Sequence, residues 1–354
     1  MTILQFFLWS LLKVAVVTVV MLLGVAYTVL LERKLVGRIQ NRWGPSRVGP
    51  FGLLQPLVDG AKSFLKEDII PSGVYRPLYL LAPILALGCT LISIAVVPFG
   101  EPGAGPGRFD LFEISDLNIG LLVILGVTSI GVYGIALAGW SSNNKYSLLG
   151  ALRSSAQLVS YELALGLSLV GVVLRAGSLN LRMIVEQQSK QGMASWNISP
   201  WSKYGGMQFV AFFIYLMAAY AETNRSPFDL PEAESELTGG YHTEYSSMKF
   251  AMFFMAEYGN MITVGCVATL LFLGGWTSPM GDLIGPFENG FVNAGLSLFW
   301  FVSKVFCFLC LYVWVRGTLP RFRYDQLMNF GWRWLMPLAI LNIVATSLWL
   351  ACRS

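Results

Sequence analysis

Charged residues are scarce in this sequence. Lys, Arg, Asp and Glu make up 12% of its 354 residues, whereas soluble domains carry roughly 25%. Hydrophobic residues reach 55%, and the mean hydropathy is +0.61. Such a composition cannot keep a protein surface in water, so the sequence predicts an integral membrane protein. Apolar runs recur along the whole chain and leave no stretch for a soluble core, so we expect one membrane domain over 1–354.

Metal ligands are scarce as well, with one histidine, His242, and five cysteines. The cysteines lie in or beside apolar runs and are interpreted as small buried thiols, without a disulfide framework. Cys307 and Cys310 form a C-x-x-C, but no second pair accompanies them. We therefore expect no metal site and no haem with two His ligands, and any redox cofactor must belong to another chain. The formal charge of +4 gives no support for nucleic-acid binding.

Apolar runs of spanning length predict about eight transmembrane helices. Each must be helical, because an open strand edge cannot satisfy its backbone in hydrocarbon. The fifth run is short, and two prolines follow it within 221–231, where we expect irregular backbone lining a cavity. The runs lie near 4–31, 78–99, 119–140, 156–174, 207–220, 248–273, 291–315 and 334–351.

The placement of basic residues predicts the orientation. Fifteen Lys and Arg residues lie in the odd-numbered loops, and six lie in the even-numbered loops and the termini. Because basic residues gather on the cytoplasmic side, the odd loops are predicted to be cytoplasmic. Both termini then face outward.

The first cytoplasmic loop carries an amphipathic pattern near 53–66. Leu57, Ala61 and Phe64 fall on one face of a helix, and Asp59 and Lys62 fall on the other. The pattern predicts an interfacial helix lying flat at the membrane surface. Such a helix is either a plain anchor or the wall of a cavity that opens towards lipid.

Two carboxylates lie at membrane depth, Glu162 in the fourth run and Glu257 in the sixth. A charge near a helix centre costs about 2.5–3.5 kcal/mol on insertion scales, so each needs a partner, water or a proton. Intramembrane carboxylates are therefore candidates for a proton path.

The fifth loop is the most acidic part of the chain, and Arg225 is the only basic residue before Lys249. Like charges held close together favour proton uptake and release. A solvated acidic loop is the alternative, and the nearby carboxylates at depth favour a proton path. The acids of this loop are Glu222, Asp229, Glu232, Glu234, Glu236 and Glu244.

The first loop has the opposite charge, with Arg33, Lys34, Arg38, Arg42 and Arg47 among turn-forming residues. Ordinary positive-inside charge explains part of this cluster. A basic, turn-rich loop beside an interfacial helix can also shape an opening for an amphipathic ligand with a polar head and an apolar tail.

Five long motifs resemble a known family, the H subunit of bacterial NADH-quinone oxidoreductase, which is respiratory complex I. The match runs from the first helix to the last. The motifs are Glu32-Arg33-Lys34 with Gln40-Asn41-Arg42-Trp43-Gly44-Pro45, the stretch Leu54-Gln55-Pro56-Leu57-Val58-Asp59-Gly60, the ten residues from Ser141 to Gly150, the fourteen from Ala221 to Glu234, and Arg321-Phe322-Arg323-Tyr324-Asp325-Gln326.

The resemblance implies an eight-helix subunit that joins the peripheral arm of the complex to its membrane arm and forms much of a quinone chamber. On this basis the chain has no catalytic activity alone, and quinone is a substrate. NADH, FMN and iron-sulfur clusters would be bound by partner subunits. The implied partners are the quinone-site and iron-sulfur subunits of the peripheral arm, small membrane subunits, antiporter-like subunits and membrane lipids.

The resemblance also implies roles for residues at the motif positions. Glu32, Arg33, Arg42 and Asp59 would line the quinone chamber near its entrance. The proton path would follow Glu162, Glu222, Asp229, Glu232, Glu234, Glu236, Glu244 and Glu257.

Two alternatives remain at this stage. The membrane anchor of an energy-converting hydrogenase would share the helices and several acids but would need no quinone cavity. A stand-alone secondary transporter is the second alternative, although no internal repeat is evident. The expected location is the bacterial inner membrane, in preference to the mitochondrial inner membrane.

Overall fold

The computed structural model describes residues 3–101, 112–200, 206–229, 239–281 and 290–352. Throughout these ranges the regular structure is helical, which confirms the predicted all-α class. In the described ranges, seven helical segments have the length and hydropathy to cross a membrane, and an eighth apolar helix is shorter.

Each predicted run coincides with a helix, but two helices are longer than predicted: α1 continues to Ile39 instead of ending near 31, and α5 begins at Lys145 instead of near 156. The short eighth member is α7, which has 16 residues, fewer than the about 20 that a straight span needs. The bounds are α1 Ile3–Ile39, α3 Arg76–Ala95, α4 Gly120–Ser141, α5 Lys145–Ala176, α7 Met207–Glu222, α9 Ser247–Phe272, α10 Gly290–Thr318, and α11 Tyr324–Phe330 continuing through a π-helical turn, Gly331–Leu335, into α12 Met336–Ala351.

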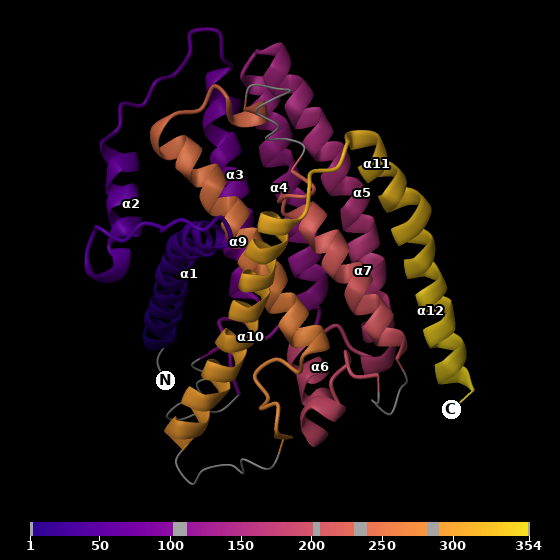
Figure 1. Ribbon diagram of the computed structural model, residues 1–354. Helices are drawn as coiled ribbons and strands as arrows, with labels where there is room; N and C mark the ends of the chain where they lie inside the picture. The colour runs from indigo at the N-terminus through magenta and orange to yellow at the C-terminus, as the bar shows by residue number, and fades with distance from the viewer. Residues whose placement is uncertain (1–2, 102–111, 201–205, 230–238, 282–289, 353–354) are drawn as a thin grey trace.

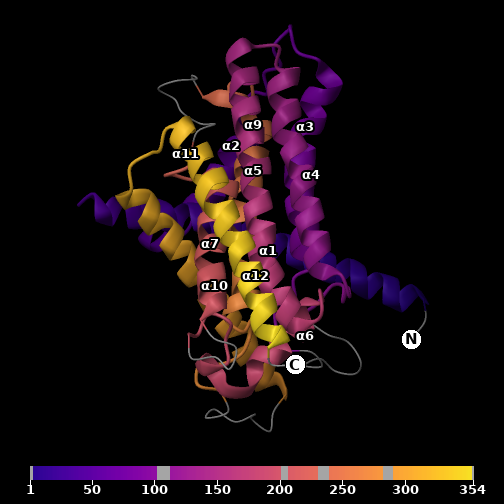
Figure 2. The ribbon, with the colours of Figure 1, turned by 90° about the vertical axis from the view of Figure 1, so that its right-hand side faces the viewer.

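Successive long helices run in alternating directions (Figure 1). The loops after α1, α4, α7 and α10 therefore lie at one end of the bundle, and α1 begins and α12 ends at the other. The odd loops, which hold most of the basic residues, thus share one end of the bundle. Figure 2 shows that α1 is steeply tilted across the other helices, while α12 packs on α5 and α7.

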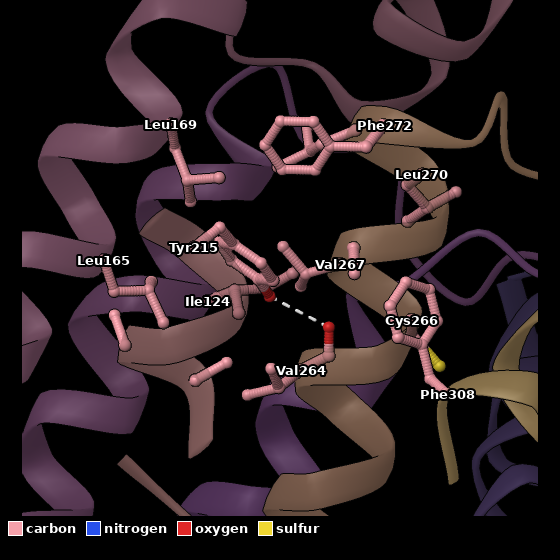
Figure 3. Packing of buried hydrophobic residues seen from close by; sticks show 14 of the residues in the cluster. Ile124, Leu165, Leu169, Tyr215, Val264, Cys266, Val267, Leu270, Phe272 and Phe308 are labelled. Carbon is pink, nitrogen blue, oxygen red and sulfur yellow. Dashed lines mark hydrogen bonds between the residues drawn. The ribbon is translucent and has the colours of Figure 1, made fainter. Parts of the chain in front are cut away.

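The core lies between α5, α7 and α9 (Figure 3). Tyr215 of α7 is buried there among Leu165 and Leu169 of α5 and Phe272 of α9. Its hydroxyl donates a hydrogen bond of 2.9 Å to the Val264 carbonyl oxygen, so the one polar atom of this side chain is satisfied.

Small residues allow the helices to cross closely. A Cβ atom at Gly134 of α4 would lie 3.0 Å from the Ala82 carbonyl oxygen of α3, and one at Gly259 of α9 would lie 2.5 Å from Thr90 Cγ2 of α3. These two crossings hold α3 against both neighbours and bring polar residues of α3 and α9 together.

Two short helices lie outside the long ones. Helix α2, Gln55–Leu65, is the predicted amphipathic helix of the first loop, and α6, Leu181–Gln188, lies at the opposite end of the bundle. No residue of α2 is buried, and Leu57 and Phe64 are exposed. An exposed apolar face is what an interfacial helix presents to lipid.

Two expectations need correction. Only Cys89 and Cys266 are buried, whereas Cys307 and Cys352 are exposed, because they lie on the outward face of α10 and at the end of α12. All five cysteines are free thiols. The run predicted to begin at 334 begins earlier, at Tyr324, because α11 and the π-helical turn continue directly into α12.

Candidate functional site

A buried cluster of charges joins three distant parts of the chain. Arg225, in the loop after α7, has its Nε atom 2.7 Å from Glu257 Oε1 of α9 and its Nη1 atom 3.6 Å from Glu32 Oε2 of α1. Arg316, near the end of α10, forms a further ion pair with Glu32. Tyr258 donates a hydrogen bond of 2.7 Å to Glu32, and the centre of its ring lies 4.0 Å from the Arg225 guanidinium.

The charges in this cluster balance, with two arginines facing two glutamates. The side chains of Arg225 and Glu257 are 7% and 9% exposed, and that of Glu32 is 12% exposed. Charges removed from water to this extent persist because each has an opposite charge beside it, and Glu32 also accepts hydrogen bonds from Tyr258 and Arg316. The cluster therefore supplies fixed charge at the depth where the first loop meets the helix bundle.

Glu257 also belongs to a second feature, a small cavity of about 50 Å³ between α3, α4, α5, α7 and α9. Glu162 and Glu222 line the same cavity. Glu162 accepts a hydrogen bond from Ser129 of α4. The cavity thus gathers three of the eight carboxylates predicted for a proton path, including both that the sequence places at membrane depth.

The local sequence explains why α7 stops beside this cavity. Thr223 ends the helix, and Asn224 takes a left-handed conformation with φ of 50°, which asparagine tolerates better than most residues. Gln157 of α5 then donates hydrogen bonds of 2.8 Å to the Ala221 and Phe228 carbonyl oxygens. The irregular backbone predicted after α7 is therefore present over 223–229 and is held by α5.

The other predicted acids lie apart from the cavity. Asp229 accepts a hydrogen bond of 2.8 Å from Arg321, and Glu244 accepts one of 2.7 Å from the Asn144 side chain. Both contacts join odd loops, because Asp229 and Glu244 lie between α7 and α9, Arg321 between α10 and α11, and Asn144 between α4 and α5. The remaining three predicted acids, Glu232, Glu234 and Glu236, lie outside the described residues.

The four residues expected to line a quinone chamber are divided between two environments. Glu32 lies in the buried cluster. Arg33 pairs with Asp59 of α2 at 2.7 Å, but their side chains are 50% and 37% exposed. Arg42 hydrogen-bonds Gln40 on the exposed part of the loop. Only Glu32 among them therefore touches the other candidate groups in the described part of the chain.

Sequence reasoning missed the cationic half of the cluster. Arg225 stood out only as the sole basic residue of an acidic loop, and Arg316 was counted among the charges that set orientation. The signal that could have found them is charge balance, because a buried Glu32 and Glu257 require two cations. Separation along the chain, which is 284 residues between Glu32 and Arg316, hid the pairing.

His242 does not belong to either feature. It lies in the loop before α9, where its ring makes edge contacts with Tyr241 and Phe250. Burial among these rings lowers the pKa of His242 to about 4, since an apolar environment disfavours the charged imidazolium. The single histidine is therefore uncharged near pH 7.

A larger apolar cavity of about 500 Å³ lies between α1, α9 and α10. Its walls include Met21 and Leu31 of α1, Ile262 of α9 and Phe301 of α10. It reaches Leu31, the residue before Glu32, so an apolar space ends next to the charged cluster. A volume of this size lies within the range of small-molecule sites, about 300–1,000 Å³.

No group of three or more His, Cys, Asp or Glu residues suited to a metal ion occurs in the described ranges. The carboxylates that do gather are shared with arginines or line the small cavity.

Comparison with known proteins places these features in a family. The family model described as NADH dehydrogenase matches residues 12–347. The chain is 60% identical to the second H subunit of NADH-quinone oxidoreductase from Koribacter versatilis, with 98% of each chain covered. It is 47% identical to the first H subunit from Solibacter usitatus over 97% of this chain and 96% of that one. It is 49% identical to the H subunit from Leptospira biflexa over 93% of this chain and 91% of that one.

The match covers nearly all of the chain, including the helices that carry the charged cluster and the cavity. The resemblance of the five motifs is thereby confirmed. The chain belongs to the family of H subunits of NADH-quinone oxidoreductase, and it is a membrane component of an oxidoreductase complex.

Proposed function

We propose that this chain forms the membrane wall of a quinone chamber and passes protons released or taken up at that chamber to carboxylates inside the bundle. Glu257 is the observation that carries the proposal. Its carboxylate pairs with Arg225 in the cluster that contains Glu32, and the same side chain lines the cavity with Glu162 and Glu222. One residue thus connects the charged end of the first loop with the acids of the cavity.

The shape of the surroundings suits an amphipathic substrate. A quinone has a polar head and an apolar tail, and here an apolar cavity ends beside a charged, hydrogen-bonding cluster. The side chains of α1, α9 and α10 accommodate hydrocarbon, while Tyr258 and the two arginines keep the neighbouring end of the chamber polar. Helix α2 and its Arg33–Asp59 pair then border the opening towards lipid.

The chemistry of electron supply would lie in partner subunits. NADH, FMN and iron-sulfur clusters would be held there, together with the groups that bind the quinone head, and this chain would contact those subunits at the end that carries the odd loops. Antiporter-like and small membrane subunits would receive the protons. Because the relatives described above are bacterial, we propose the bacterial inner membrane as the location.

The test is Glu257→Gln in the assembled complex, which removes the carboxylate that could accept a proton but keeps the shape of the side chain. We expect NADH-dependent quinone reduction and proton pumping to fall together. NADH oxidation by an artificial water-soluble acceptor should stay normal, because it does not use the membrane chamber. Glu162→Gln should lower the same two activities.

Glu186→Gln is the matched control, since Glu186 lies at the opposite end of the bundle and its side chain is 59% exposed. Its quinone activity should equal that of the parent complex. Normal quinone reduction and pumping in assembled Glu257→Gln and Glu162→Gln complexes would refute the proposal. Purification of the chain in mild detergent without NADH-oxidising partners would favour the transporter alternative.

A further inference from the structure

The small cavity has a polar wall that the carboxylates alone do not explain. Besides Glu162, Glu222 and Glu257, it is lined by Asn224 and Asn260. Its volume of about 50 Å³ has room for about three water molecules, because one needs roughly 15 Å³ in this measure. A bound water also needs two to four polar partners.

Asn224 is fixed in place by the backbone and by one side-chain contact. It follows the last turn of α7 in the left-handed conformation, and the residue is 7% exposed. Its side-chain amide nitrogen lies 3.4 Å from Ser154 Oγ of α5, to which it donates a weak hydrogen bond. The amide is therefore held between α5 and the cavity.

The other end of this amide is unsatisfied within the described part of the chain. Asn224 Oδ1 is buried and has no hydrogen-bond partner there, and the same holds for Glu222 Oε2. A buried acceptor without a donor is costly, so such atoms in native proteins are as a rule bonded to ordered water. Both residues line a cavity of sufficient size for that water.

Polar side chains of α3 and α9 also line the cavity and can complete the coordination of a bound water. Thr90 of α3 donates a hydrogen bond of 2.9 Å to Asn260 of α9, and both side chains line the cavity. The close crossing of α3 and α9 at Gly259 sets this pair in place. The cavity is thus lined by neutral polar groups of α3, α9 and the loop after α7 as well as by the three carboxylates.

We propose that Asn224 is a positioning residue that holds a bound water through its side-chain oxygen, and that this water links the carboxylates of Glu222, Glu257 and Glu162. The inference rests on the proposed function, because it names a neutral residue of the same proton path. Water passes a proton by accepting one from a neighbour and releasing another to the next acceptor. No covalent bond to the protein forms, and no oxidant is needed.

A neutral amide suits this position for an electrostatic reason. The titratable groups that line the cavity are the three glutamates, Tyr241 and Cys89, and Arg225 lies next in sequence. A fourth carboxylate would add negative charge where three already meet, and would favour their protonated forms. An amide supplies the acceptor oxygen without that charge.

Two substitutions in the assembled complex test the proposal. Asn224→Gly keeps the left-handed backbone that glycine adopts freely but removes the amide. We expect quinone reduction and pumping to fall about five- to tenfold, because the free energy of one lost hydrogen bond corresponds to a rate change of that size. NADH oxidation by the artificial acceptor should stay normal. Asn224→Asp keeps the oxygen and the shape but adds charge, and should move the pH dependence of quinone reduction to higher pH.

The matched control is Asn143→Gly, which removes an exposed asparagine with the same φ of 50° from the loop between α4 and α5. It should leave activity and pH profile unchanged. Equal losses in the two glycine variants, or normal activity in assembled Asn224→Gly, would overturn the proposal.

If Asn224→Gly fails to assemble, the pH profile of Asn224→Asp is the test. A shift of quinone reduction to higher pH would support Asn224 as a positioning residue, and an unchanged profile would overturn that role. The parallel variants Glu257→Gln and Glu162→Gln separate the two levels of the argument. When these lose activity and Asn224→Gly does not, the proton path stands and only the role of Asn224 fails. When all three are normal, the proposed function itself fails.

Discussion

Arg225 and Glu257 form a buried ion pair, with 2.7 Å between Arg225 Nε and Glu257 Oε1, that fastens the loop after α7 to α9. The pair lies where the charged cluster and the small cavity meet, because Glu257 contributes to both. A change in the position of this loop would therefore also change the surroundings of the Glu257 carboxylate inside the bundle.

Removal of the cation should be more damaging than its replacement. Arg225→Gln removes the arginine that pairs with Glu257 and leaves Glu32 with Arg316 alone. Breaking a buried ion pair in this way typically lowers stability by about 3–5 kcal/mol. We expect poor assembly, measured by native gel and by the thermal midpoint of the isolated complex. Arg225→Lys keeps the charge but lacks the planar fork, so it should assemble with partial quinone activity. An Arg225→Gln complex as stable as its parent would show that the pair is not needed.

The exposed arginines of the first loop should affect quinone turnover without affecting stability. Exposed pairs such as Arg33–Asp59 contribute about 0–1 kcal/mol, so Arg33→Ala and Arg42→Ala should assemble normally. If these residues border the chamber entrance, the ratio of quinone to artificial-acceptor activity in membranes will fall, and Arg42→Lys will restore only part of it. An unchanged activity ratio in both alanine variants would show that Arg33 and Arg42 do not border the chamber entrance.

His242 should make the fold sensitive to acid. Its pKa is about 4 when folded, against 6.5 when exposed, so the unfolded state binds a proton first as pH falls. The contribution of the uncharged imidazole to the free energy of unfolding is fully present above about pH 6.5 and is lost as the pH falls towards 4. The two limits differ by about 3 kcal/mol. His242→Phe should reduce the loss of thermal stability between pH 7 and pH 4.5. An identical loss in parent and variant would contradict this.

Lys304 should hold the loop after α9. Its ammonium donates hydrogen bonds of 2.8, 2.8 and 2.7 Å to the carbonyl oxygens of Leu273, Gly275 and Thr277, and it lies 4.2 Å from the Trp196 ring. Lys304→Met leaves these carbonyls without their donor, so we expect a loss of about 3 kcal/mol or more.

Hydrogen exchange over 273–277 is the measurement for this loop, and it should accelerate in Lys304→Met. The exposed Lys66→Met serves as the control and should exchange as the parent does. Equal protection of the loop in parent and Lys304→Met would show that the three hydrogen bonds do not hold it.

The helices could be predicted because each apolar run carries its own signal. Hydrocarbon forces such a run to be helical, so each of the eight predicted runs coincides with an observed helix. The ends were harder to place: α11 is polar enough at Asp325 to look like loop, yet it continues into α12 through a π-helical turn.

The candidate site was only half predictable. Glu162 and Glu257 stand out because a carboxylate within an apolar run is costly in any membrane helix. Their neighbours in space do not, because Arg225 and Asn224 belong to a loop where such residues are ordinary. The tertiary arrangement decides that Asn224 lines the cavity and that Asp229 pairs with Arg321 elsewhere. The local amino-acid sequence around these residues does not indicate which residues they contact in the fold.

The charged cluster also has a consequence for biosynthesis. Glu32 leaves the ribosome on the first helix, whereas its partner Arg316 follows 284 residues later on α10. At about 5–20 residues per second, that interval lasts roughly 15–60 s. The earlier helices must therefore insert with one carboxylate still lacking part of its counter-charge, and the cluster becomes neutral only when α10 arrives.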